Sequence, residues 1–159
     1  MTQLGFDFVD RRVMAAVQRV ASNDPNPADP FRGLYISDET ALRLTHGDSA
    51  SGADDRLEAV SRALGLDLLD SAVLAVCAAP ELNPRFGRLY AYLQDDVTRK
   101  LPSARLVGHL LEGEGVTAAD VMTSFDQNGP LRRLGAVKLL GDAQTPLAER
   151  PLKVADHIS

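Results

Sequence analysis

The chain has 159 residues, of which 45% are hydrophobic and 25% are charged, and its formal net charge is −5 at neutral pH. This length and composition suit one compact domain or two small packed subdomains, and they exclude a chain that is disordered throughout. No basic leader precedes an apolar run at the N-terminus, and no segment approaches the roughly 20 apolar residues that cross a bilayer. We therefore expect a cytoplasmic protein with no membrane partner.

Cysteine and histidine usage argues against metal chemistry. Cys77 is the only cysteine, so no disulfide can form within the chain and a zinc site of several thiolates is excluded. It lies in the apolar run 72–79, where a small buried hydrophobic side chain is the expected role. His46, His109 and His157 are far apart and show no metal-ligand spacing. We expect no metal and no cofactor in this chain.

The first 52 residues are predicted to hold one amphipathic helix followed by irregular chain. Apolar residues recur at three- and four-residue spacing over 6–21, with Val9, Val13, Val17 and Val20 on the buried face. Three prolines predict a loop over 22–30. A short strand at 34–36, a brief helix at 37–44 and a flexible linker at 46–52 complete this segment.

Residues 54–82 are predicted to form two helices. The first runs from Asp54 to Gly65, a glycine suited to ending a helix. The second, over 68–79, is capped by Asp67 and apolar around most of its circumference, which is typical of a helix buried on every side. We expect Pro80 to end this helix.

A third helix is predicted to begin at Asn83 and Pro84, with the asparagine as N-cap and the proline at the first helical position. Its expected buried face comprises Phe86, Leu89, Tyr90, Leu93 and Val97. Gly87 costs about 1 kcal/mol relative to alanine inside a helix. Its presence therefore predicts the close approach of a neighbouring helix.

The last third of the chain follows the order of a winged helix. A helix at 103–111 ends at Gly113, and a second helix is expected at 117–125 after a tight glycine turn. Strands at 135–140 and 151–154, joined by a loop, then form a hairpin. The predicted fold class is mainly α (α+β), a helical bundle followed by a winged-helix-like helix-turn-helix plus β-hairpin.

Motifs for nucleotide binding and covalent catalysis are absent from the sequence. The three lysines follow Arg99, Val137 and Leu152, so there is no Gly-Lys-Ser/Thr of a P-loop. No Gly-x-Gly-x-x-Gly occurs, and the glycines at 113 and 115 indicate a turn. No serine is framed as a nucleophile elbow. We therefore expect no catalytic residue.

Two acidic pairs, at 54–55 and 95–96, are predicted to be solvated and not catalytic. Adjacent helical residues point about 100° apart and do not face each other. The basic pair Arg132 and Arg133, between two leucines, suits contact with phosphate, an acidic partner or water. With Met122 and Phe125, these arginines are the candidate partner-binding residues.

DNA recognition by the second winged-helix element is disfavoured by its charge. Residues 118–126 contain Asp120 and Asp126 and no Arg or Lys, whereas phosphate contacts need cations. The hairpin tip at 144–146 also lacks a basic residue. We expect no nucleic-acid partner.

The segment APELNPRFGRLYAYLQDDVTR, residues 79–99, resembles the N-terminal winged-helix-like region that precedes the motor domain in a family of bacterial AAA-type (AAA+) ATPases. Some relatives in that family accompany contractile injection systems. Residues 129–134 and 150–156 resemble the family's segment just upstream of its ATPase domain. The similarity spans about 54–159, whereas the first fifty residues resemble no family known to us.

The sequence pattern predicts three segments: an N-terminal helix, proline-rich loop and linker (1–52), a helical subdomain (53–98), and a winged-helix-like subdomain (99–159). The resemblance implies that the third segment leads into an ATPase domain, and that ATP and Mg belong to that ATPase domain in a hexameric parent. We expect the chain to be part of that longer protein, a stand-alone relative being the second possibility.

The leading functional hypothesis is a non-catalytic interaction or regulatory domain that contacts its own ATPase domain and a further protein partner. It positions partner proteins or supports ring assembly. The alternative is a winged-helix DNA-binding regulator, and an enzyme acting alone ranks third.

The missing phosphate-binding loop generates a first prediction. The purified chain should neither bind nor hydrolyse ATP, because no glycine-rich loop and lysine are available to hold the phosphates. Isothermal calorimetry with ATP and Mg checks this, and a saturable heat of binding would contradict it.

Overall fold

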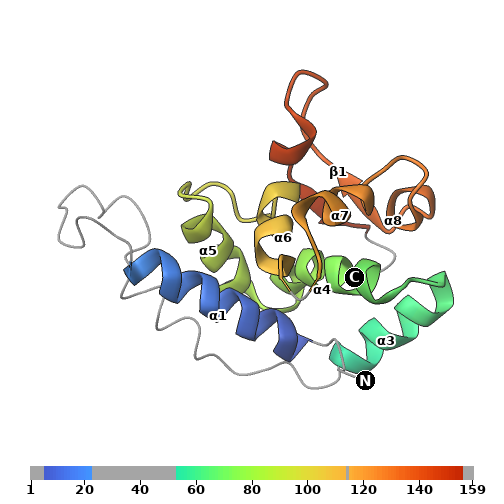
Figure 1. Cartoon of the computed structure of the whole chain (residues 1–159), viewed down its shortest axis with the longest axis horizontal. Helices are drawn as coiled ribbons and strands as arrows, with labels where there is room; N and C mark the ends of the chain where they lie inside the picture. The colour runs from blue at the N-terminus through green and yellow to red at the C-terminus, as the bar shows by residue number, and fades with distance from the viewer. Residues whose placement is uncertain (1–5, 23–52, 114, 156–159) are drawn as a thin grey trace.

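The computed structural model describes residues 6–22, 53–113 and 115–155 (Figure 1). The predicted strand at 34–36, helix at 37–44 and linker at 46–52 lie outside these residues, as do His46, His157 and most of the loop at 22–30. The described part is mainly helical with a two-stranded antiparallel sheet, which confirms the predicted fold class. The elements follow in this order: α1 (Phe6–Ser22), α3 (Ala53–Leu64), α4 (Leu68–Leu82), α5 (Pro84–Leu93), α6 (Ala104–Leu111), α7 (Ala118–Thr123), α8 (Pro130–Arg133), β1 (Val137–Leu139), η2 (Leu147–Glu149) and β2 (Leu152–Val154).

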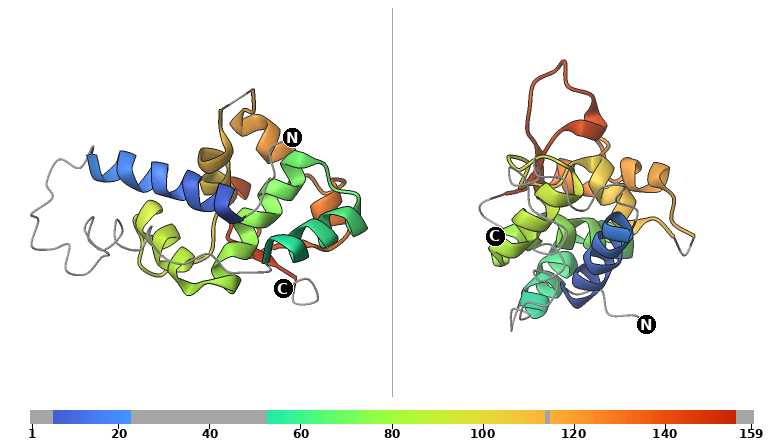
Figure 2. Two further views of the ribbon diagram at one scale, coloured as in Figure 1. Left: turned by 90° about the horizontal axis from the view of Figure 1, so that it is seen from below. Right: turned by 90° about the vertical axis from the view of Figure 1, so that its left-hand side faces the viewer.

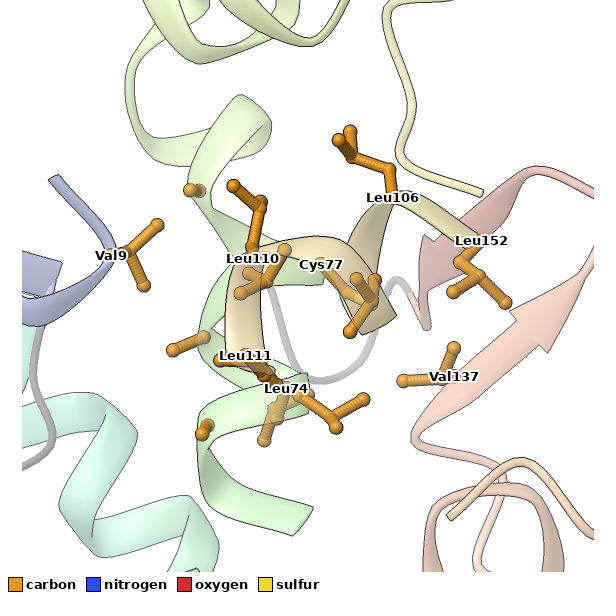
Figure 3. Close-up of a cluster of buried hydrophobic side chains, with 14 of the residues drawn as sticks. Val9, Leu74, Cys77, Leu106, Leu110, Leu111, Val137 and Leu152 are labelled. Carbon is orange, nitrogen blue, oxygen red and sulfur yellow. The ribbon is translucent and has the colours of Figure 1, made fainter. Parts of the chain in front are cut away.

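Helix α4 is the centre of the fold, as its apolar circumference predicted. It packs against α1, α3, α5, α6, α8 and β2. Figure 2 shows it running through the middle of the molecule with α1 and α3 along its flanks. In Figure 3, Leu74 and Cys77 of α4 lie among side chains from α1, α6 and both strands. The two residues are almost fully buried.

Helix α4 continues past Pro80 to Leu82, so the prediction that Pro80 ends the helix is wrong. Proline has no N–H to donate to the carbonyl four residues earlier, which is that of Val76. The hydroxyl group of Tyr90, on α5, donates to this same carbonyl oxygen at 2.7 Å. A neighbouring helix thus supplies the donor that the proline lacks, and the last turn of α4 persists.

Helix α5 is shorter than predicted. Asn83 caps it and Pro84 opens it as expected, but it ends at Leu93 because the chain turns there, with Asp95 at a φ of 54°. Val97 is therefore off the helix and 40% exposed, which corrects its expected burial. The acidic pair at 95–96, which was predicted to be solvated, lies just beyond the helix end, with Asp95 exposed and Asp96 partly buried. Asp96 accepts hydrogen bonds from the backbone and hydroxyl of Thr98, and these lower its carboxyl pKa.

The segment after α5 is held by one side chain. The Gln94 amide nitrogen donates to the carbonyls of Arg99 and Leu101, and its amide oxygen accepts from the Ser103 N–H. This segment passes over Gly87, where a Cβ would lie 3.4 Å from that of Lys100. The close neighbour of Gly87 is thus a loop and not the helix that we predicted.

Helix α1 packs on the rest of the domain. Its buried residues Val9, Val13 and Val17 confirm the predicted face, whereas Val20 is exposed. Arg85 of α5 donates to Asp10 of α1 at 2.7 Å, in an ion pair that is mostly buried. Helix α1 and the described parts of the predicted segments 53–98 and 99–159 contribute to one hydrophobic cluster.

The winged-helix part matches its predicted order. Helices α6 and α7 are joined by a turn in which Gly113 and Gly115 adopt positive φ angles, a conformation that suits glycine. A reciprocal capping box between Thr117 and Asp120 starts α7, which ends at Thr123 and not at Phe125. The sheet pairs β1 with β2, and a bridge from Ser103 to Pro151 extends β2 on its other side.

The burial of α4 generates a second prediction. Replacing Leu74 by alanine should lower the free energy of unfolding by about 2 to 5 kcal/mol, because this side chain is buried where α4 packs against α6 and the hairpin. Denaturant titration followed by circular dichroism checks this. A loss below about 0.5 kcal/mol, the size of a surface effect, would contradict it.

The hydrogen bond between the Tyr90 hydroxyl and the Val76 carbonyl generates a third prediction. Tyr90→Phe should cost about 1 to 3 kcal/mol of stability, since it leaves the buried Val76 carbonyl without a donor. In a Pro80→Ala background the alanine N–H can donate to that carbonyl, so the same substitution should cost clearly less. A double-mutant cycle from denaturant curves measures the difference, and equal costs in both backgrounds would refute the compensation.

Candidate functional site

The four predicted partner-binding residues do not occupy equivalent positions. Phe125 is fully buried, so it is not the exposed anchor that we expected. Met122 is partly buried at the edge of the core, Arg132 is half-buried, and Arg133 is exposed. The structure brings Met122, Phe125 and Arg132 together around one pocket and leaves Arg133 outside its lining.

This depression, which we call the α7–wing pocket, has a volume of about 450 Å³. Its lining residues come from the end of α7, the following turn, α8 and the wing, which is the chain between β1 and β2. They are Met122, Thr123, Phe125, Asp126, Gln127, Arg132 and Leu147. Phe125 is the one fully buried residue among them, Met122 and Leu147 are the other apolar side chains, and the remaining four are polar.

The side of the pocket formed by the end of α7 is fixed by two polar contacts. The Arg132 guanidinium donates to the Phe125 carbonyl oxygen at 3.1 Å, which ties α8 to the turn after α7. Ser124 is buried, and its side chain lies close to the carboxylate of Asp70 at the start of α4. Burial, and then the nearby charge of Asp67, raise the pKa of Asp70 above its usual value.

The opposite wall is Leu147, in the short helix η2 of the wing. Glu149 at the end of η2 is the attachment point of this segment. Its carboxylate accepts from Arg105 of α6 at 2.6 Å and lies 3.5 Å from Arg99, and its carbonyl oxygen accepts from Arg99 at 2.6 Å. These contacts hold η2 against the body of the domain, although the rest of the wing projects away from it (Figure 1).

Sequence reasoning missed Leu147 because the stretch 141–149 was expected to be a plain loop. The sequence did contain an indication, because Leu147 directly follows Pro146, a residue that often opens a helical turn. Asp126 was noted only for its charge. Its place beside Arg132 in the pocket depends on the turn between α7 and α8, which the pattern did not specify.

The exposed surface of α7 is acidic, and its side chains are small. Ala118, Ala119, Asp120 and Thr123 are exposed, and no residue of α7 is basic. Hydrogen bonds from the backbone N–H and hydroxyl of Thr117 lower the pKa of Asp120, so its negative charge persists below the usual range. In the wing, Thr145 and Gln144 donate to Asp142 and lower its pKa in the same way.

Among residues 6–22, 53–113 and 115–155, no three His, Cys, Asp or Glu side chains gather in a way that suits a metal ion. Burial raises the pKa of the Cys77 thiol far above its ordinary value, so this thiol stays protonated. None of the described helices has both the length and the apolar character that crossing a membrane requires.

The attachment of η2 generates a fourth prediction. Glu149→Ala should accelerate amide hydrogen exchange in the wing, residues 140–151, because Arg105 loses its partner and Arg99 keeps only the carbonyl. Global stability should change by about 1 kcal/mol or less, as these ion pairs are partly exposed. Exchange measured by mass spectrometry checks this, with Glu112→Ala as the matched exposed control. Unchanged exchange in the wing would refute the role of Glu149.

Comparison with known proteins agrees with this architecture. No curated protein and no solved structure matches the chain significantly. The family model described as "Winged helix domain, variant" matches residues 5–159, a span that includes α1 and α3 as well as the helix-turn-helix and hairpin. The chain therefore belongs to the winged helix domain, variant family.

Proposed function

We propose that this winged-helix domain is a non-catalytic protein-interaction domain, and that the α7–wing pocket is its contact site. Winged helices serve either DNA binding or protein interaction, so the family leaves both classes open. The observation that carries the choice is the exposed surface of α7, which presents Asp120 and no cation where a DNA-reading helix would face phosphates.

The acidic surface disfavours DNA for an electrostatic reason. Binding to duplex DNA gains free energy when cations replace the counterions of the phosphates. Asp120 is fixed in the capping box and Asp126 is exposed beyond the helix end, so both would face a polyanion with like charge. Two cations near the hairpin, Arg133 and Lys138, are exposed, but they lie outside α7. A DNA-binding regulator stays the alternative function.

We further propose that the domain belongs to a bacterial AAA-type ATPase, as the likeness of 79–99, 129–134 and 150–156 to that family implies. In this proposal ATP and Mg act in the ATPase domain of a hexameric, cytoplasmic parent. The winged-helix domain positions partner proteins or supports assembly of the ring. Association with a contractile injection system is the finer part of the same proposal.

The gene beyond the Ser159 codon tests the ATPase part. A Gly-x-x-x-x-Gly-Lys-Thr motif encoded in the same reading frame would support it, because this loop is what an ATPase needs to hold phosphates. An uninterrupted reading frame for a different domain, or a stop codon at that point, would refute it.

DNA titration tests the choice between the two classes and is the fifth prediction. At about 0.15 M salt, mixed-sequence duplex DNA should show no binding to the chain in fluorescence anisotropy. The double substitution Arg132→Glu and Arg133→Glu should leave the fold intact by circular dichroism and weaken contact with the ATPase domain or protein partner. A submicromolar dissociation constant for DNA that rises steeply with salt would favour the DNA-binding alternative.

A further inference from the structure

We propose that the α7–wing pocket recognises a protein segment that carries one large apolar side chain next to an acidic residue. The apolar side chain occupies the pocket, and the carboxylate binds Arg132. This inference rests on the proposed function and specifies the partner of the same site.

The first step is the distribution of apolar and polar groups in the pocket. Met122 and Leu147 provide the accessible apolar surface, Phe125 lines the pocket but is itself fully buried, and the other lining residues are polar. An apolar centre with a polar rim is the arrangement of protein-interaction sites in which a single buried side chain supplies much of the binding energy. A volume of about 450 Å³ lies within the range of ligand sites, so the pocket has room for one large side chain together with its flanking backbone.

The second step is the charge on the rim. Arg132 and Asp126 both line the pocket, and each has its own hydrogen-bond partner, the Phe125 carbonyl oxygen for Arg132 and the Asn128 N–H for Asp126. The guanidinium of Arg132 has five N–H donors, and its one bond to another described residue is to the Phe125 carbonyl. That bond fixes the group in place while donors remain for a carboxylate, the acceptor whose geometry matches a guanidinium.

The third step is orientation. Asp126 accepts from the Asn128 N–H and is exposed, so one part of the rim is negative while the part at Arg132 is positive. A segment with acidic residues on both sides of its anchor would meet Asp126 with like charge. One acidic residue, on the Arg132 side only, therefore complements the rim. Exposed Arg133 adds attraction for the same acidic residue at longer range.

The fourth step concerns the wall that comes from the wing. Leu147 is the one lining residue outside the stretch 122–132, so the pocket exists only while η2 is held in place. The contacts of Glu149 with Arg99 and Arg105 provide this attachment. Glu149 is thus a positioning residue for the pocket, although it does not line it.

The test uses the 159-residue chain and a random peptide library displayed on phage. Enriched peptides are synthesised, and their dissociation constants are measured by fluorescence anisotropy. The expected sequences carry one large apolar residue with an acidic residue within two positions of it. Leu147→Ser and Arg132→Gln should each weaken their binding by about tenfold or more, as loss of an anchor contact does.

The chain offers a matched control in Leu140. Leu140 and Leu147 are both in the wing and both 37% exposed, but only Leu147 lines the pocket. Leu140→Ser should change the peptide dissociation constant by less than about twofold, well below the tenfold step of 1.4 kcal/mol. Thermal unfolding of both variants checks that the two serines perturb the fold equally. Equal weakening by both would overturn the proposal.

A charge swap separates recognition from a merely structural role of Arg132. Arg132→Glu should weaken binding of the acidic peptide, and a peptide with lysine in place of its acidic residue should recover affinity for this variant. Failure of that recovery would overturn the contact with Arg132. A chain that dimerises, with Leu147→Ser dissociating the dimer, would make a second copy the occupant and also overturn the proposal.

The outcomes distinguish this inference from the proposed function. Enrichment of basic peptides, of peptides insensitive to Leu147→Ser, or of none at all would refute the partner assigned to the pocket. The proposal of a protein-interaction domain would then stand without the α7–wing pocket as its contact site. Salt-sensitive submicromolar binding of duplex DNA would instead refute the proposed function itself.

Discussion

The fold depends on the burial of α4 on all sides. Ala72 to Cys77 are almost completely removed from water, and this requires other elements to cover every side of the helix. Helices α1, α3, α5 and α6 cover parts of it, and β2 and α8 contact it from the winged-helix part. The helical bundle and the winged helix therefore share one core, and the position of each element follows from the side of α4 that it covers.

A buried central helix must also satisfy its own backbone, and Pro80 makes this difficult. An unpaired carbonyl in an apolar interior costs about as much free energy as a lost hydrogen bond. The Tyr90 hydroxyl meets this need for Val76, and burial raises the pKa of Tyr90, so the group remains a protonated donor at neutral pH. One side chain of α5 thus fixes the position of α5 relative to the last turn of α4.

Local rules predicted the caps and the periodic faces because those depend on residues close in sequence. Asp67, Asn83 and Thr117 each cap the helix expected of them. The errors at Pro80, Val97 and Phe125 have a different origin. Each depends on a contact between segments distant along the chain, or on a turn such as the one at Asp95 that periodicity does not reveal. The pocket was only half predictable for the same reason, since Leu147 joins it through the folding back of the wing.

The same packing explains why a winged helix need not bind DNA. Helix α7 turns its apolar residue Val121 into the core and exposes alanine, threonine and aspartate. Its capping box uses Asp120 for local structure, so helix initiation itself places a negative charge where phosphates would approach. The end of α7, in contrast, meets η2 across a depression that combines the apolar side chains of Met122 and Leu147 with the fixed guanidinium of Arg132. Apolar surface beside a single cation offers little to a polyanion, whose contacts need several cations, and this is the physical basis of the proposed interaction with a protein.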